Sequence, residues 1–262
     1  MNRPSEKVLV FRRPPLGENN TMESLIIFVI VVCFVCMLLV GKGSNQPSRR
    51  KKTRQNSNQK KQSNLNKEEK TALKGAIGEQ IIKVQVLSKL DTARYRYFHN
   101  LIVPIDGGST QIDNIVISPY GIFVIEAKYF QGWIFGAPNQ PRWTHTLPSG
   151  SKFSFQNPLR QNYKHIKALS KLLGLSDKEF HSIVAFTHRN CQLKTTFPEN
   201  VCLVSDFIPY VQKHDKEVFS IEQCTEFCRI LSNPDFEATP ERIEHHVQSL
   251  KQKETSAVHH VV

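Results

Sequence analysis

The pattern of apolar and polar positions divides the chain into an apolar segment, a polar segment and a long region of regular elements. Residues 25–40 are consecutively apolar and carry no charge. Residues 45–66 are almost entirely Gln, Asn, Ser, Lys and Arg. This composition predicts a disordered tether, because it offers too little apolar surface to form a core. From residue 67 onward apolar positions recur at helix and strand spacing, which predicts a folded domain.

The first helix of this domain is expected over about residues 67–90, after an N-cap signal at Asn66. A small apolar stripe contains Ile82 and Val86, and Glu79 falls on that side of the helix rather than on the obvious solvent face. The larger stripe, which we expect to face the core, consists of Leu73, Ile77, Ile81 and Val84.

The remaining elements alternate between short strands and helices. A helix opens at Asn157-Pro158 and ends at Gly174, and two polar-faced helices are expected near 220–231 and 240–252. This order predicts an α/β fold in which a mixed central β-sheet is flanked by helices. The expected strands are 95–103, 111–118, 121–128, 133–136, 142–144, 183–186 and 201–204.

The hairpin expected over residues 111–128 contains three charged residues in otherwise apolar strands. These residues are Asp113, Glu126 and Lys128. Burying a charge is costly unless it is paired or binds a metal, so a metal-dependent active site would explain them. The alternative is a buried Asp–Glu–Lys cluster that only fixes the hairpin, although such ion pairs add little stability.

Two registers of this hairpin are possible. If the loop has two residues, Ser118 opposes Gly121 and Asp113 lies across from Glu126, with Cβ atoms about 5 Å apart. Lys128 then lies on the same face as Glu126, because strand side chains alternate. A bulge at Gly121 would instead slip the pairing by one residue and send Asp113 to the opposite face. The metal-site hypothesis therefore requires the first register.

Residues 24–41 are long enough and apolar enough to predict a short transmembrane helix. A cleaved signal peptide and a buried core helix are the alternatives, but no small-x-small cleavage site follows the segment. Basic residues begin at Lys42, and positive charge beside a span stays on the cytoplasmic side. We therefore expect a single-pass membrane protein with a cytoplasmic carboxyl-terminal domain. Met22, directly before the span, is an alternative start of the chain.

The net charge of +12 is concentrated in the tether. Residues 42–74 contain eleven Lys or Arg and two Glu, whereas residues 75–262 contain twenty basic and eighteen acidic residues. Attraction to anionic headgroups explains the tether as well as nucleic acid does, so affinity of the domain for nucleic acid must come from a local patch. The four cysteines beyond residue 190 lack the paired spacing of a zinc site.

Several motifs together resemble the nuclease-related domain (NERD) family over roughly residues 74–187. They occur in the family's order and spacing, and the family is related to the PD-(D/E)XK restriction-endonuclease-like fold. The motifs are Gly75-Ala76-Ile77-Gly78-Glu79-Gln80, Gln111-Ile112-Asp113, Gly121-Ile122-Phe123-Val124-Ile125-Glu126-Ala127-Lys128, Gly132, Trp143 and Asn157-Pro158-Leu159-Arg160-Gln161-Asn162.

The resemblance implies a restriction-endonuclease-like core and a set of site residues. Asp113 and Glu126 would be the metal ligands for Mg²⁺ or Mn²⁺, and Lys128 would be the catalytic lysine. Glu79 would be a helical carboxylate that supports the site, and Gln161 a polar accessory. The implied activity is metal-assisted hydrolysis of phosphodiester bonds in nucleic acid, with DNA favoured over RNA. Four histidines, at positions 99, 145, 165 and 188, are further candidates for proton transfer.

These expectations divide the chain into five parts. They are a polar amino-terminal segment (1–23), a transmembrane helix (24–41), a basic disordered linker (42–66), a nuclease-like domain (67–190) and an α/β extension with two helices (191–262). The principal hypothesis is a membrane-anchored nuclease. The alternative is a non-catalytic module, tethered to the membrane, that binds nucleic acid or protein.

Overall fold

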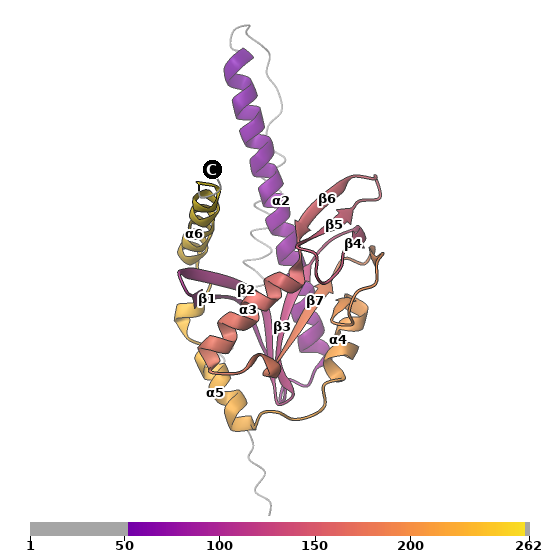
Figure 1. Ribbon diagram of the computed structural model, residues 1–262, viewed down its shortest axis with the longest axis vertical. Helices are drawn as coiled ribbons and strands as arrows, with labels where there is room; N and C mark the ends of the chain where they lie inside the picture. Colours follow the sequence, from indigo (N-terminus) through magenta and orange to yellow (C-terminus); the bar gives the residue numbers. More distant parts are fainter. Residues whose placement is uncertain (1–51, 260–262) are drawn as a thin grey trace, which may run out of the picture. The chain divides into compact units, whose positions relative to one another are not determined.

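The computed structural model describes residues 52–259 (Figure 1). The polar segment 1–23, the expected transmembrane helix 24–41 and the first part of the basic linker lie outside the described residues. The chain divides into two compact units, Met1–Asn58 and Gln59–Val262, and the fold is that of the second unit. Across residues 52–259, no helix combines the length and the apolar character needed to cross a membrane.

Helix α2 spans Lys52–Lys89 and begins well before the expected start near residue 67. The structure thus makes residues 52–66 helical, where their composition predicted disorder. The physical reason is that residues 48–74 contain neither Gly nor Pro, and Lys, Gln and Arg are good helix formers. Propensity therefore extends the helix into a segment that contains almost no apolar residue.

The face of α2 that packs on the sheet is the smaller apolar stripe, so the expectation of a core stripe at Leu73 and Val84 is wrong. Leu73 and Val84 are each 59% exposed, whereas Ile82 and Val86 are fully buried. Gly78 favours this face, since a Cβ there would lie 3.3 Å from the Thr187 hydroxyl, and glycine lets the helix approach this closely without displacing that side chain. Glu79, next to Gly78, is consequently half-buried.

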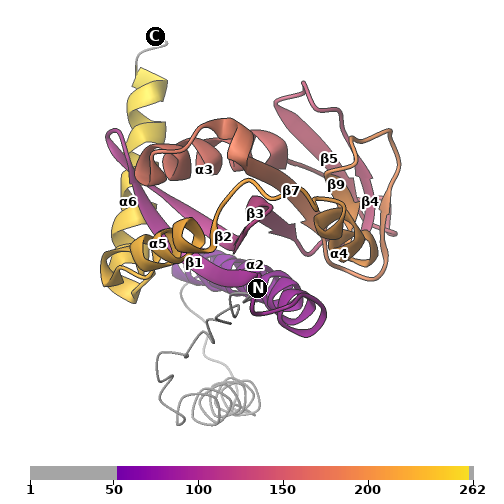
Figure 2. The same ribbon diagram turned by 90° about the horizontal axis from the view of Figure 1, so that it is seen from below.

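The central sheet has five strands in the order β1-β2-β3-β7-β9. The first three strands are antiparallel, and β3, β7 and β9 are parallel, so the sheet is mixed as the sequence predicted. Its faces are covered by α3 (Pro158–Leu173) on one side and by α2 on the other, as Figure 2 shows. The strands are β1 (Arg96–Ile105), β2 (Gly108–Ser118), β3 (Gly121–Lys128), β7 (Phe180–Phe186) and β9 (Val201–Leu203).

A second, four-stranded sheet continues from the carboxyl ends of β3 and β7. Its order is β6-β5-β4-β8, and β4 and β8 are parallel, as are β3 and β7. The two parallel strands of the first sheet thus lead, side by side, into two parallel strands of the second. Its strands are β4 (Gly132–Phe135), β5 (Arg142–Thr146), β6 (Lys152–Gln156) and β8 (Cys191–Leu193), of which β6 and β8 were not predicted.

The segment after residue 190 completes the central sheet and its core. It contributes β9 to the sheet, and helix α5 (Ile221–Leu231) contributes buried residues to the core on the α3 side. Helix α6 (Pro240–His259) confirms the last predicted helix. Helix α4 (Val204–Gln212) was not predicted, and it begins at the residue with which the predicted strand 201–204 would have ended. The expected extension is therefore part of the same compact unit.

Candidate active site

The β2–β3 hairpin has the first of the two predicted registers. Ser118 pairs with Gly121 and Asn114 with Ile125, and this register, continued by one pair, would bring Asp113 opposite Glu126. The Ser118 side chain fixes this turn, because its hydroxyl donates to the Gly121 carbonyl and accepts the Tyr120 N–H. The condition set by the sequence for a shared carboxylate site is met.

The β1–β2 ladder is interrupted beside Asp113. Asn100, the position on β1 opposite Asp113, has a φ of +53°, which is uncommon for a residue other than glycine. The side-chain amide of Gln111 donates to the Asn100 side chain over 2.6 Å. Ile112 then packs in the same core as Ile115, which regular alternation would forbid. Backbone distortion of this kind is concentrated at functional sites.

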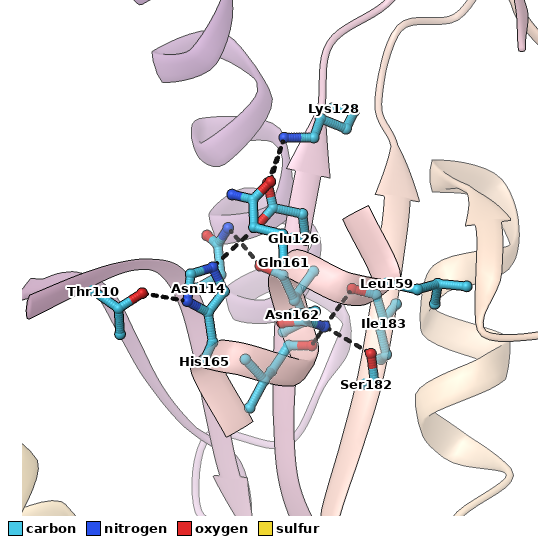
Figure 3. A network of polar contacts seen from close by, with 12 residues as sticks. Thr110, Asn114, Glu126, Lys128, Leu159, Gln161, Asn162, His165, Ser182 and Ile183 are labelled. Atoms are coloured by element: carbon cyan, nitrogen blue, oxygen red, sulfur yellow. Dashed lines mark hydrogen bonds and ion pairs between the residues drawn. The ribbon is translucent and has the colours of Figure 1, made fainter. Parts of the chain in front are cut away.

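Glu126 is the most deeply buried charged residue of the cluster and is 1% exposed. Its Oε1 atom accepts a hydrogen bond from Lys128 Nζ over 2.5 Å (Figure 3). Its Oε2 atom lies 3.4 Å from His165 Nε2, yet neither of these two atoms makes a hydrogen bond. Burial raises the pKa of Glu126, but the charge of Lys128 and the contact with His165 outweigh this and hold the pKa below its usual value.

Asp113 and Glu79 add two further carboxyl groups to this cluster. Burial and the charges of Glu126 and Glu79 raise the pKa of Asp113 well above its usual value, although Lys128 and a hydrogen bond from the Ala127 N–H oppose the rise. Burial and the charge of Glu126 also raise the pKa of Glu79. Three carboxyl groups therefore share a confined space with one ammonium group, and negative charge is in excess.

Helix α3 supplies the third side of the site. The helix begins at Asn157, whose side chain accepts the Leu159 N–H, and Pro158 occupies its first turn. Asn162 is fully buried and donates to the backbone carbonyls of Val124 and Ile183, which ties the helix to β3 and β7.

Because Asn162 fixes the helix, its neighbours reach the charged cluster from one side. Gln161 Oε1 accepts a hydrogen bond from Lys128 Nζ over 3.4 Å, and His165, one turn later, reaches Glu126 (Figure 3). The structure thus brings Gln161 to Lys128, as expected of a polar accessory.

Sequence reasoning missed two contributions to the site. His165 was one of four histidines named without preference, and its position four residues after Gln161 was the available signal. Its Nδ1 atom lies 2.9 Å from the Thr110 hydroxyl, which orients the ring. Tyr97 donates to Asn114 over 2.6 Å. Burial raises the pKa of Tyr97, and the charges of Glu79 and Asp113 raise it further.

The donor set of the cluster fits a hard divalent cation. Carboxylate oxygens are the ligands that Mg²⁺ and Mn²⁺ prefer, and the excess negative charge and the unbonded Oε2 of Glu126 favour a cation there. In the part of the chain that the structure describes, no group of three or more His, Cys, Asp or Glu side chains is arranged to hold a metal ion. Asp113 and Glu126 remain the candidate ligands that the sequence predicts.

Comparison with known proteins places this cluster within a recognised domain. Residues 74–187 match the nuclease-related domain (NERD) family, a segment that contains Glu79, Asp113, Glu126, Lys128 and Gln161. An uncharacterized protein of Bacillus anthracis is 46% identical over 122 residues, which are 46% of this chain and 56% of the relative. The chain thus spans about half the length of this relative. No solved structure matches the chain.

Proposed function

We propose that the protein is a metal-dependent nuclease that hydrolyses phosphodiester bonds of nucleic acid, DNA more than RNA. The observation that carries this proposal is the cluster of Glu79, Asp113 and the buried Glu126 at the end of β3, inside the segment that matches the nuclease-related domain. A scaffold would be more stable with apolar residues in these positions, because buried ion pairs add little stability. The cluster is therefore better explained by chemistry than by folding.

Each residue of the cluster has a role that its contacts support. Asp113 and Glu126 would hold Mg²⁺ or Mn²⁺, which when bound polarises a phosphate and lowers the pKa of its water. Lys128 carries a positive charge, because the charges of Glu126 and Asp113 raise its pKa against the opposing effect of burial. It can therefore stabilise the negative charge that develops on the phosphate in the transition state.

The other polar residues hold this arrangement in place. Gln161 accepts a hydrogen bond from Lys128 and so directs the ammonium group. Glu79 adds negative charge from α2 and strengthens the attraction for a cation. We further propose that residues 24–41 anchor the chain in a membrane, with this domain on the cytoplasmic side and the basic tether close to anionic headgroups.

One contact supports a second candidate function. Lys128 Nζ occupies Oε1 of Glu126, an oxygen that a shared cation would need. If that pair persists in the presence of divalent ions, the domain is a binding module that retains the fold without cleavage.

Nicking of supercoiled plasmid by the full chain in Mg²⁺ or Mn²⁺ tests the principal function. Glu79→Gln should lower the rate about 10- to 100-fold, as loss of a supporting group near a metal does. Glu69→Gln is the matched control, because Glu69 is an exposed residue on the same helix. Equal nicking by the wild type and by variants at Asp113 and Glu126 would contradict the proposal. Absence of divalent-ion binding in calorimetry would favour the binding module.

A further inference from the structure

The second sheet buries one face and exposes the other. Ile134 and Trp143 are at most 1% exposed and pack with Val184 and Phe186 of the first sheet's core. Because side chains alternate along a strand, the register assigns the residues between them to the opposite side, which we call the outer face. The outer face carries Trp133, Phe135, Arg142, Thr144, Lys152, Ser154, Gln156 and Gln192, and also Thr146, which is buried.

Aromatic and basic side chains dominate the outer face. Phe135 is 38% exposed, and Trp133 is half-buried with Lys194 Nζ placed 5.9 Å from its ring centre. Arg142 lies flat on β6, because its Nε and Nη2 atoms donate to the hydroxyl and carbonyl of Ser154. Aromatic rings and cationic groups thus lie together on this face.

The segment that forms β4, β5 and β6 contains no acidic residue, whereas Glu199 and Asp206 line a pocket beside Gln192 and Lys194. Between Glu126 and Asp177 the chain has no Asp or Glu. The same stretch contains seven basic residues, namely Lys128, Arg142, Lys152, Arg160, Lys164, Lys167 and Lys171. On the outer face itself, Arg142 and Lys152, together with Lys194 beside Trp133, form a local basic group of the kind that binding to nucleic acid requires.

The outer face is rigidly connected to the candidate active site. Three residues separate Lys128 at the end of β3 from Gly132 at the start of β4. The loop between β4 and β5 is tied to the start of α3, because Asn157 donates to the carbonyls of Pro138 and Gln140. Figure 1 shows the second sheet beside the end of β3 and β7 from which it continues.

We propose that the outer face binds single-stranded nucleic acid and presents its backbone to the carboxylate cluster; this inference rests on the proposed nuclease function. Unpaired bases stack on Trp133 and Phe135, while Arg142, Lys152 and Lys194 contact phosphates. Exposed rings on a flat sheet select single strands, because the bases of a duplex are already stacked on one another. The substrate class is therefore single-stranded DNA or RNA, or a single-stranded stretch next to a duplex.

Fluorescence anisotropy of a labelled oligothymidylate with the full chain in EDTA, where cleavage is suppressed, tests this surface. Phe135→Ala should weaken binding about tenfold, which is the usual cost of losing one stacked base. Phe153→Ala is the matched control and should change affinity less than about twofold, because Phe153 is 51% exposed on the same sheet but lies on its other face. Neither substitution alters charge, so attraction by the basic tether is constant.

A second pair of variants tests the phosphate contacts. Arg142→Ala should weaken binding severalfold and flatten the dependence of affinity on salt by about one counterion. Lys216→Ala should change neither the affinity nor its dependence on salt. Lys216 is exposed at the far end of the domain, in the loop that packs on the β2–β3 turn.

Intrinsic fluorescence gives an independent measurement, because the chain has only two tryptophans, Trp133 and the buried Trp143. Oligothymidylate should quench the emission of the wild type, and Trp133→Phe should remove the quenching. The proposal is overturned if Phe135→Ala and Phe153→Ala have the same affinity for oligothymidylate. It is also overturned if duplex DNA or anionic phospholipid vesicles bind as tightly as the single strand and this binding depends on Phe135.

The outcome separates this inference from the nuclease proposal. If cleavage depends on Glu126 but Phe135→Ala binds with unchanged affinity, the nuclease proposal stands and the proposed binding surface is wrong. If binding depends on Phe135 but no cleavage occurs, the proposed binding surface stands and the nuclease proposal is wrong.

Discussion

The two sheets of the domain differ in burial and in charge. The five-stranded sheet is covered by helices on both faces, and a cluster of three acids, of which Glu126 is buried, lies where β3 ends. The four-stranded sheet is covered on one face only, and its strands contain no acidic residue at all. The two sheets are nevertheless continuous along the chain, because β3 leads to β4 and β7 leads to β8.

This difference indicates a division of roles within one rigid unit. A cation and a developing phosphate charge require fixed, desolvated carboxylates, which only a sheet buried on both faces can hold. A polymeric substrate requires a broad open surface with basic and aromatic side chains. Placing both on continuous strands fixes the distance between binding and chemistry. The predictions below test whether the roles are separate.

Glu126→Gln should have the largest effect and should affect only chemistry. Loss of this carboxylate removes a proposed metal ligand and the partner of Lys128, so the rate of cleavage should fall about 10³-fold, a drop typical of losing one main electrostatic group. Affinity for oligothymidylate in EDTA should stay within about twofold, because Glu126 is buried away from the outer face. Single-turnover cleavage and anisotropy measure the two quantities. A parallel loss of affinity would show that the roles are not separate.

Two neighbouring residues of β4 test the difference between the faces of the second sheet. Ile134 is fully buried, so Ile134→Ala should lower the free energy of unfolding by about 2–4 kcal/mol through the cavity it leaves. Phe135 is substantially exposed, and Phe135→Ala should lower the free energy by less than about 1 kcal/mol while weakening nucleic-acid binding. Urea denaturation measures both. Equal destabilisation would place Phe135 in the core and contradict its role in binding.

Asp113→Asn should stabilise the protein while abolishing cleavage. Burial and the neighbouring negative charges raise the pKa of Asp113, so its stabilising effect is complete below the pKa of the unfolded state and is lost as the pH rises through the folded-state value. At any pH above the pKa of the unfolded state, this carboxyl group therefore costs stability. A neutral isostere should raise the free energy of unfolding by about 0.5–2 kcal/mol in EDTA, the usual gain from relieving strain at a functional site.

Divalent ions should reverse the order of stability, so that the wild type becomes more stable than Asp113→Asn. Mg²⁺ at about 100 times its dissociation constant should stabilise the wild type by about 2.7 kcal/mol and leave Asp113→Asn unchanged. Asp215→Asn, at an exposed position, is the control for the change of charge. A wild type that gains nothing from Mg²⁺ would argue against a metal site.

Local signals were enough to predict much of the fold and of the site. The β2–β3 hairpin was predicted with both candidate registers, and the Ser118 side chain, which selects between them, was visible in the sequence but not interpreted. The caps of α3 were predicted because Asn157, Pro158 and Gly174 act on neighbouring backbone groups. Alternation in β3 correctly placed Glu126 beside Lys128.

The features that sequence reasoning missed depend on contacts between distant segments. The buried face of α2 was predicted wrongly, because helical spacing favoured the larger apolar stripe. Gly78 instead allows the smaller stripe to approach the sheet closely. The contact between His165 and Glu126 depends on Asn162, which fixes α3 against β3 and β7. The outer face of the second sheet requires the parallel pairing of β4 with β8, and no local pattern encodes that pairing.

The smallest expected effect concerns the end of β3 opposite the acidic cluster. There His181 Nε2 donates to the Tyr120 carbonyl over 3.0 Å, and its ring centre lies 4.0 Å from that of His214. Burial lowers the pKa of His181, the Tyr120 contact opposes this, and the charge of His214 lowers the pKa further. A folded-state pKa below the unfolded value means that stability is present above about pH 6.5 and is lost as the pH falls below it.

Urea denaturation between pH 8 and pH 5 should therefore show a loss of stability on acidification, and His181→Gln should make the curve shallower. Burial also lowers the pKa of His99 and His246, so part of the slope should remain in the variant. Because this histidine pair lies far along β3 from Glu126, the same substitution should leave single-turnover cleavage at pH 8 unaltered. A change in that rate would mean that the two ends of the strand are coupled.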